Sequence, residues 1–232
     1  MVKVDFGNFE KKAGITFTNK ELLKQAFVHR SYINENRNAN IGHNERLEFL
    51  GDAVLELVVT CFLYEKYPER TEGDLTAYRS ALVNAVTLGA LAEQLGMNDY
   101  LLLSRGEAKD KGRGRQVILA NTMEAFIGAL YLDQGYDGAQ GFVAKNLFPL
   151  TEKIVENKTW LDAKSHFQEK AQEVFGVTPL YKTMFETGPD HDKHFTVGVF
   201  LDNAQVALGD GKSKQEAEQD AAQKGLAAKG WL

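Results

Sequence analysis

The sequence His-Asn-Glu-Arg-Leu-Glu-Phe-Leu-Gly-Asp at residues 43–52 carries three carboxylates, Glu45, Glu48 and Asp52. These positions are three and then four residues apart, so a helix places them on one face, about one and two turns along. The residues between and after them are mostly apolar, which indicates a helix packed against a core. Carboxylates beside a buried helix must be paired, hydrogen-bonded or bound to a metal ion. The stretch is therefore a candidate functional site.

Length and composition are those of an ordinary globular protein. The chain has 232 residues, of which 44% are hydrophobic and 25% are charged, enough for one large domain or two smaller ones. No apolar run reaches the length that crosses a membrane, and the first residues lack the apolar core of a signal peptide. The single cysteine, Cys61, cannot form a disulfide within the chain. We expect a cytoplasmic protein without a membrane partner.

The formal net charge of −5 is not typical of a nucleic-acid-binding protein, because such proteins often have a basic binding domain. It does not exclude one either, since binding needs a local basic patch and not a basic total. Acidic clusters that hold a metal ion would also lower the sum.

The first 150 residues predict one helix after another, and we place an all-α domain at residues 6–153. Pro68, Gly96 and Gly135 are expected to end three of the helices, and Pro149 to interrupt the last. The predicted helices cover residues 20–34, 44–67, 72–95, 116–132 and 139–154.

A short polar joint at residues 156–159 precedes a different pattern, α-β-β-β-α, which predicts a second domain at residues 161–232. The last helix is expected to begin at a capping box, Ser-Lys-Gln-Glu at 213–216, and the sequence Gly-Asp-Gly at 209–211 to break the chain before it. The earlier elements are predicted at residues 163–175 (helix), 180–186, 195–201 and 205–208 (strands).

Further acids occur on two other predicted helices. Asn121 and Glu124 share a helix face, and Glu72 begins the helix after Pro68, where acids often only interact with the helix dipole. Oxygen-rich clusters suit a hard cation such as Mg²⁺. The chain has no Cys/His set for zinc and no glycine-rich nucleotide loop, so no small-molecule cofactor is expected. Spacing alone leaves a carboxylate Mg²⁺ site and a solvated acidic helix face as open interpretations.

The sequence at 43–52 resembles the signature of the ribonuclease III family. The resemblance continues through Glu-Gly-Asp-Leu at 72–75 and Met-Glu-Ala-Phe-Ile-Gly-Ala at 123–129. The C-terminal pattern, with Gly-Pro-Asp-His at 188–191 and Gly-Lys-Ser-Lys at 211–214, resembles a double-stranded RNA-binding domain. The implied fold class is mainly α: an all-α endonuclease domain followed by a small α+β domain of α-β-β-β-α order.

The resemblance also implies an activity, Mg²⁺-dependent hydrolysis of double-stranded RNA, for which Mn²⁺ could substitute. The products would carry 5′-phosphate and 3′-hydroxyl ends with a short 3′ overhang, and the substrates would include rRNA precursors, mRNAs and other structured RNAs. The expected partners are duplex RNA and a second copy of the chain, in a symmetric homodimer whose subunits each cut one strand. Phe49, an apolar residue beside the acids, is a candidate interface anchor, with core packing an equal alternative.

Carried over position by position, the resemblance implies the metal ligands Glu48, Asp52, Asn121 and Glu124. Asp52 and Glu124 match the pair most directly tied to catalysis. Glu45 and Glu72 match supporting acids near the RNA and the subunit boundary.

Position 121 departs from the family pattern, which has aspartate where this chain has Asn121. An amide offers an oxygen but no charge, so we expect weaker Mg²⁺ binding and an intact fold. Two interpretations are open: a natural variant with compensation elsewhere, or a substitution that permits binding and slows cleavage. The alternative function is accordingly a non-cleaving double-stranded RNA-binding protein. A metal phosphohydrolase acting on small substrates is disfavoured by the C-terminal domain.

Three elements of the C-terminal domain fit the shape of an RNA duplex, which is recognised through minor-groove hydroxyls and phosphates. They are the first helix, one loop and the start of the last helix, where backbone N–H groups and lysines suit phosphate. The candidate residues are Gln168, Gln172, His191, Lys212, Ser213 and Lys214. Residues 161–232 hold eight Lys, no Arg, six Asp and five Glu, a net charge of −3. We therefore expect weak, salt-sensitive binding by this domain alone.

Overall fold

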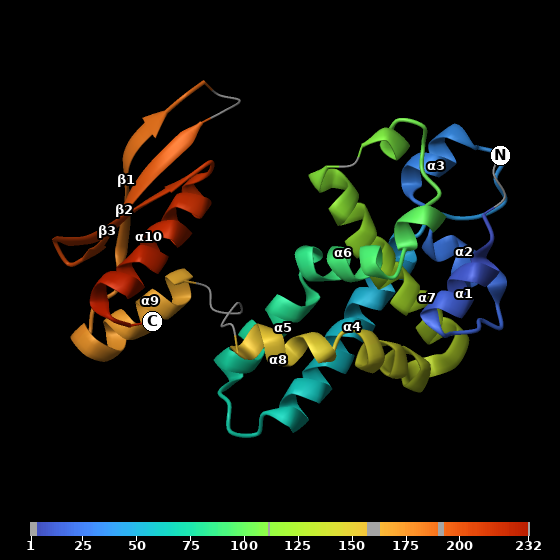
Figure 1. Cartoon of the computed structure of the whole chain (residues 1–232), viewed down its shortest axis with the longest axis horizontal. Helices are drawn as coiled ribbons and strands as arrows, with labels where there is room; N and C mark the ends of the chain where they lie inside the picture. The colour runs from blue at the N-terminus through green and yellow to red at the C-terminus, as the bar shows by residue number, and fades with distance from the viewer. Residues whose placement is uncertain (1–3, 111, 157–162, 190–192, 232) are drawn as a thin grey trace. The chain divides into compact units, whose positions relative to one another are not determined.

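The computed structural model describes residues 4–110, 112–156, 163–189 and 193–231. The chain divides into two compact units, one within residues 1–160 and the other within residues 161–232, and Figure 1 shows the elements of each. His191, one of the predicted RNA-binding residues, lies outside the described residues.

The first unit is built from helices around two long central ones, α4 and α7, which pack against each other (Figure 1). Its core is made of aliphatic side chains and a group of aromatic rings that includes Phe9, Phe27 and Phe126. The helices are α1 (Phe6–Ala13), α2 (Lys20–Ala26), α3 (Arg30–Glu35), α4 (Glu45–Lys66), α5 (Glu72–Val83), α6 (Ala85–Gln94), α7 (Arg113–Asn146) and α8 (Pro149–Glu156), with 3₁₀ turns η1 (Met97–Tyr100) and η2 (Glu107–Lys109).

The helix predicted at residues 44–67 is confirmed as α4, whose buried face carries Leu47, Leu55 and Leu63. Asn44 precedes it and is itself buried, with its side-chain amide donating to the carbonyl oxygen of Ala26 at 3.0 Å. The first turn of α4 is thus fastened to the end of α2.

The single helix predicted at residues 20–34 is wrong, because the chain there forms α2 and α3 with a break at residues 27–29. Val28 pairs with Leu102 in an isolated parallel bridge. The N–H of Leu102 donates to Phe27 at 2.9 Å, and the N–H of His29 donates to Leu102 at 3.0 Å. Hydrogen bonds to a distant segment therefore replace those that would continue the helix.

The single helix predicted at residues 72–95 is also wrong, because Asn84 has an extended backbone (φ −72°, ψ 161°) and separates α5 from α6. Its side chain accepts the N–H of Thr87 at 2.9 Å, as expected of an asparagine that caps a new helix. Gly96 has φ 72° just after α6, so the predicted stop is confirmed.

Two further predicted breaks are confirmed. Gly135 is non-helical within α7, with φ 73° and ψ −168°, so it separates the half of α7 that carries Glu124 from the half that ends at Asn146. Pro149 begins α8, as its fixed φ and missing N–H favour.

The second unit has the predicted order: α9 (Ala163–Phe175), β1 (Leu180–Thr187), β2 (His194–Leu201), β3 (Ala204–Gly211) and α10 (Lys214–Lys229). The strands form an antiparallel sheet in the order β1-β2-β3, and α10 contacts β2, β3 and α9. Phe167 and Val199 are fully buried in this unit's own core, and so are Ala221, Ala222 and Leu226 of α10.

The break predicted at residues 209–211 is wrong, because β3 continues through Gly211. A Cβ atom on Gly209 would overlap the backbone of Ala217 and Ala221 in α10, and one on Gly211 would approach the N–H of Ala217. The glycines therefore serve close packing of the helix on the sheet.

Within the part of the chain that the structure describes, no helix combines the length and apolarity needed to cross a bilayer.

Candidate active site

The candidate site lies where α4 crosses α7 with the two backbones in contact. A Cβ atom on Gly51 would overlap the carbonyl group of Glu124, and one on Gly128 would overlap the carbonyl oxygen of Leu47. Only glycine permits such an approach at both positions. The crossing places the residue after Gly51, Asp52, on the helix face next to Glu124.

The crossing brings together the four residues expected as metal ligands, two from α4 and two from α7. Burial, and then the charges of Asp52 and Glu48, raise the pKa of Glu124 to about 7. Burial, and then the charge of Glu45, raise the pKa of Glu48, whereas a side-chain hydrogen bond with Asn121 lowers it. These shifts indicate carboxylates close enough to repel one another.

The donor set fits a hard cation. Glu48, Asp52 and Glu124 offer carboxylate oxygens and Asn121 an amide oxygen, the ligands that Mg²⁺ prefers. A cation would offset the charges of Asp52 and Glu48, which add to burial in raising the pKa of Glu124. Among the described residues, no three His, Cys, Asp or Glu side chains are grouped closely enough to hold a metal ion by themselves. Oxygen donors of this kind suit a cation that keeps several of its waters.

The site is open to a large substrate. Asp52 is exposed, and Glu48, Asn121 and Glu124 are half-buried. The carboxylate of Asp52 therefore faces solvent, whereas Glu48 and Glu124 lie against the helix crossing. A polymer could reach these acids from the solvent side.

Glu45 lies one turn before Glu48 and interacts with residues from outside α4. Its carboxylate is 3.8 Å from a guanidinium nitrogen of Arg30 on α3 and 3.6 Å from Nδ1 of His43. Its charge reaches Glu48, so the structure brings Glu45 to the edge of the acid group.

Glu72 is not brought to the acid group within one chain. It begins α5, accepts a hydrogen bond from the hydroxyl of Thr76 at 3.2 Å, and lines a hollow with Tyr64, Arg70 and Arg79. It is not among the charges that shift the pKa of Glu48 or Glu124.

Phe49 projects from α4 with 82% of its surface exposed, so the core-packing alternative for this residue is wrong. Leu57 and Tyr64, farther along the exposed side of the same helix, are 53% and 74% exposed. Large exposed apolar side chains that share one helix face are typical of an interaction surface.

The described RNA-binding candidates lie at the two helices of the second unit. Gln168 and Gln172 are exposed, one turn apart on α9. Ser213 caps α10 and accepts the N–H of Glu216 at 3.1 Å, while the Glu216 carboxylate accepts the N–H of Lys212 at 2.9 Å. This is a variant of the predicted capping box, because the glutamate binds the N–H one residue before the cap.

Sequence reasoning missed the residues that position the acids, namely Asn44, Gly51 and Gly128. Each had a signal in its motif. Asn44 directly precedes the first acid, Gly51 directly precedes Asp52, and Gly128 follows Glu124 by one helical turn. The signal is weak alone, since a glycine inside a helical pattern has many interpretations.

Comparison with protein families matches both units. A family model described as "Ribonuclease-III-like" matches residues 19–150, and one described as "Double-stranded RNA binding motif" matches residues 163–228.

Individual proteins are similar over most of the chain. "Ribonuclease 3" of Bacillus cytotoxicus is 46% identical over 221 residues, which cover 95% of this chain and 90% of that protein. "Ribonuclease 3" of Bacillus velezensis is 46% identical over 222 residues, covering 96% and 89%. Among solved structures, the nuclease domain of ribonuclease III from Campylobacter jejuni aligns with a TM-score of 0.57 and 36% identity, covering 62% of this chain and 99% of that domain.

Proposed function

Because the chain belongs to the ribonuclease III family, we propose that it is an endoribonuclease that hydrolyses double-stranded RNA. The observation that supports this most is the α4–α7 crossing, where burial, and then the charges of Asp52 and Glu48, raise the pKa of Glu124. The match of residues 163–228 to an RNA-binding motif supports a duplex substrate.

The proposed cofactor is Mg²⁺, with Mn²⁺ as a substitute, held by Asp52 and Glu124 with Glu48 and Asn121 beside them. The cation would activate a water and offset the charge that develops on phosphorus-bound oxygens. In the cation-free protein, burial and the charges of Asp52 and Glu48 raise the pKa of Glu124 to about 7, so its carboxyl group holds a proton near neutral pH that a bound cation would displace. The exposed carboxylate of Asp52 would face the substrate. Arg30 offsets the negative charge of Glu45 at the edge of the acid group.

The proposed assembly is a symmetric homodimer through the exposed face of α4 that carries Phe49, Leu57 and Tyr64. The similar Campylobacter jejuni nuclease domain is described as structurally flexible in a region involved in its dimer formation. In a two-fold dimer each subunit would cut one strand, giving 5′-phosphate and 3′-hydroxyl ends with a short 3′ overhang. Glu72 would then act near the subunit boundary.

The proposed domain limits are residues 6–153 for catalysis and 161–232 for RNA binding. In the latter, Gln168, Gln172 and the start of α10 with Lys212, Ser213 and Lys214 would contact the duplex, as would His191. A cytoplasmic role in maturing rRNA precursors and other structured RNAs fits this activity.

A second candidate function is a double-stranded RNA-binding protein that does not cleave. Asn121 favours it, because its amide supplies no charge at a ligand position and engages Glu48 in a hydrogen bond. A set of ligands with one negative charge fewer, in which Asn121 is already hydrogen-bonded with Glu48, would bind a cation less tightly.

One experiment separates the two candidates. A defined duplex is incubated with the protein over a range of Mg²⁺ concentrations and, in parallel, with a chelator, and the products are analysed for their ends. Cleavage that depends on Mg²⁺ and leaves 5′-phosphates supports the endoribonuclease. A duplex that is bound at every Mg²⁺ concentration and never cut supports the non-cleaving protein.

A further inference from the structure

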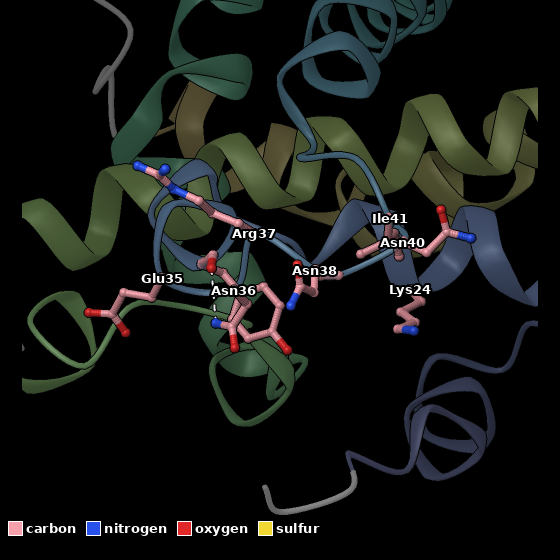
Figure 2. A pocket seen from close by; sticks show the side chains of 9 residues that line it. Lys24, Glu35, Asn36, Arg37, Asn38, Asn40 and Ile41 are labelled. Atoms are coloured by element: carbon pink, nitrogen blue, oxygen red, sulfur yellow. Dashed lines mark hydrogen bonds between the residues drawn. The ribbon is translucent and has the colours of Figure 1, made fainter.

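His43 lies directly before the acids of α4, and its backbone is fixed by hydrogen bonds. Its carbonyl oxygen accepts the side-chain amide of Gln25 at 3.2 Å, and the N–H of Asn44 donates to the carbonyl oxygen of Val28 at 2.9 Å. Residues 36–41, in the loop before it, line an open hollow (Figure 2). The position of His43 therefore depends on its bonds to the end of α2 and not on close packing of that loop.

The ring of His43 has one nitrogen without a partner. Nδ1 is excluded from solvent and, within the described part of the chain, forms no hydrogen bond. Oε2 of Glu45 lies 3.6 Å from it, just beyond hydrogen-bond distance. An unprotonated Nδ1 would turn its lone pair toward a carboxylate and would remain a buried, unsatisfied acceptor. A proton on Nδ1 removes both costs, because Nδ1 can then donate to Glu45.

Glu45 is held between two groups from outside its helix. Oε1 is 3.8 Å from a guanidinium nitrogen of Arg30, on α3, and Oε2 faces His43. Glu45 lies one turn before Glu48 on the same helix face, where like charges repel. After burial, the charge of Glu45 is the next cause that raises the pKa of Glu48. A carboxylate held at both oxygens keeps a fixed distance from Glu48, whereas a free one does not.

We propose that His43 is a positioning residue, which carries its proton on Nδ1 and donates it to Glu45. Arg30 and His43 together then fix this carboxylate at the edge of the acid group. The inference rests on the proposed function, because the acids that it orders are those of the proposed reaction. In this role His43 acts through Glu45 and not on the RNA.

The first test reads the position of the proton directly. Nitrogen-15 NMR of the complete, cation-free chain at about pH 9, where imidazole rings are ordinarily neutral, distinguishes a ring protonated at Nδ1 from one protonated at Nε2. His29 is the internal reference, because its Nδ1 accepts the N–H of Ser31 at 3.3 Å and its proton must lie on Nε2. We expect His43 to be protonated on Nδ1, opposite to His29, and to change to Nε2 in Glu45→Ala.

Two variants separate the ring nitrogens in the reaction. The side-chain amide nitrogen takes the place of Nδ1 in His43→Asn and the place of Nε2 in His43→Gln. At saturating duplex in Mg²⁺, we expect His43→Asn to retain the cleavage rate within about twofold and His43→Gln to be about tenfold slower, the effect of one lost hydrogen bond to a charged group. In the Glu45→Ala background the two variants should be equal, because the group on which they act is absent.

A proton on Nε2 of His43 in the unsubstituted protein, or no change in Glu45→Ala, would overturn the pairing. Equal rates of His43→Asn and His43→Gln, at equal melting temperatures, would overturn the positioning role. A loss confined to the affinity for duplex would do the same, since it would make His43 an RNA contact. Failure of the proposed function is seen separately, as absence of Mg²⁺-dependent cleavage by the unsubstituted protein, and the NMR result still decides whether His43 and Glu45 pair.

Discussion

At the scale of single residues, Asn121 decides how much charge the acid group offers a cation. The resemblance to the family implies aspartate there, and the asparagine is hydrogen-bonded with Glu48. We expect Asn121→Asp to raise cleavage of long duplex RNA at limiting Mg²⁺ by about tenfold, the effect of roughly 1.4 kcal/mol of added cation binding.

The measurement is an initial cleavage rate at several Mg²⁺ concentrations for both proteins. Equal rates at limiting Mg²⁺ would show that the amide does not weaken the site. The fold should not change, since asparagine and aspartate are nearly equal in shape.

Glu124 gives a prediction for pH. Its pKa is raised from 4.5 to about 7, so the folded protein holds this proton more tightly than the unfolded chain does. The free energy of unfolding should therefore fall as pH rises from about 4.5 through about 7, by on the order of 2 kcal/mol after allowance for partial exposure.

Chemical denaturation of the cation-free protein at pH 5, 6, 7 and 8 measures this change, and Glu124→Gln is the control. The glutamine variant should lose this part of the pH dependence. A variant with the same pH dependence as the unsubstituted protein would assign the effect to another group.

The sequence predicted part of the acid group for a physical reason. Glu45, Glu48 and Asp52 follow from helical periodicity within one segment, and the structure does bring Glu124 to them from α7. The positioning residues were not foreseeable in the same way, because the overlap at Gly51 becomes visible only when the partner helix is in place. The placement of Glu72 away from the acids has the same cause, a tertiary arrangement that spacing does not encode.

At the scale of helices and strands, predictions succeeded where local signals agreed and failed where distant segments intervened. The long α4 has continuous apolar periodicity and ends before Pro68. The break between α2 and α3 depends on hydrogen bonds to Leu102, which no local pattern contains. Similarly, the glycines of β3 resembled a break and in fact allow contact with α10.

The α4–α7 crossing gives a prediction at this scale. Gly51→Ala would place a methyl group into the backbone of Glu124, so the helices must separate. We expect the free energy of unfolding to fall by about 3 kcal/mol. We also expect the folded variant to cleave duplex RNA more slowly in Mg²⁺ than the unsubstituted protein does, since Asp52 and Glu124 move apart. Thermal denaturation and cleavage rates are the measurements.

Gly141→Ala, in the partner helix α7, is the control. A Cβ atom at Gly141 meets no atom within 4 Å, so alanine should be neutral or stabilising by up to about 1 kcal/mol. If Gly51→Ala behaved like Gly141→Ala, the close approach would not be what positions the acids.

At the scale of the whole molecule, the proposed dimer requires the exposed face of α4. Phe49→Asp places a charge at a residue that is 82% exposed in the single chain. We expect a monomer by sedimentation at micromolar concentration, with an unchanged circular dichroism spectrum, because the residue contributes nothing to the core.

Loss of the dimer should also lower the affinity for duplex RNA, since two linked binding units gain from effective concentration. Glu65→Lys, an exposed substitution on the same helix, is the control for a charge change alone. A Phe49→Asp protein that still sediments as a dimer would place the interface elsewhere.

The bend at Gly135 has a consequence for chirality. Its angles, φ 73° and ψ −168°, are the mirror image of ordinary extended backbone, and a Cβ atom there would meet nothing within 4 Å. An L-alanine has the room but the wrong hand, whereas a D-alanine introduced by chemical ligation has both. The D-residue should therefore fix the bend that glycine only permits, and the folded enzyme should become more resistant to heat.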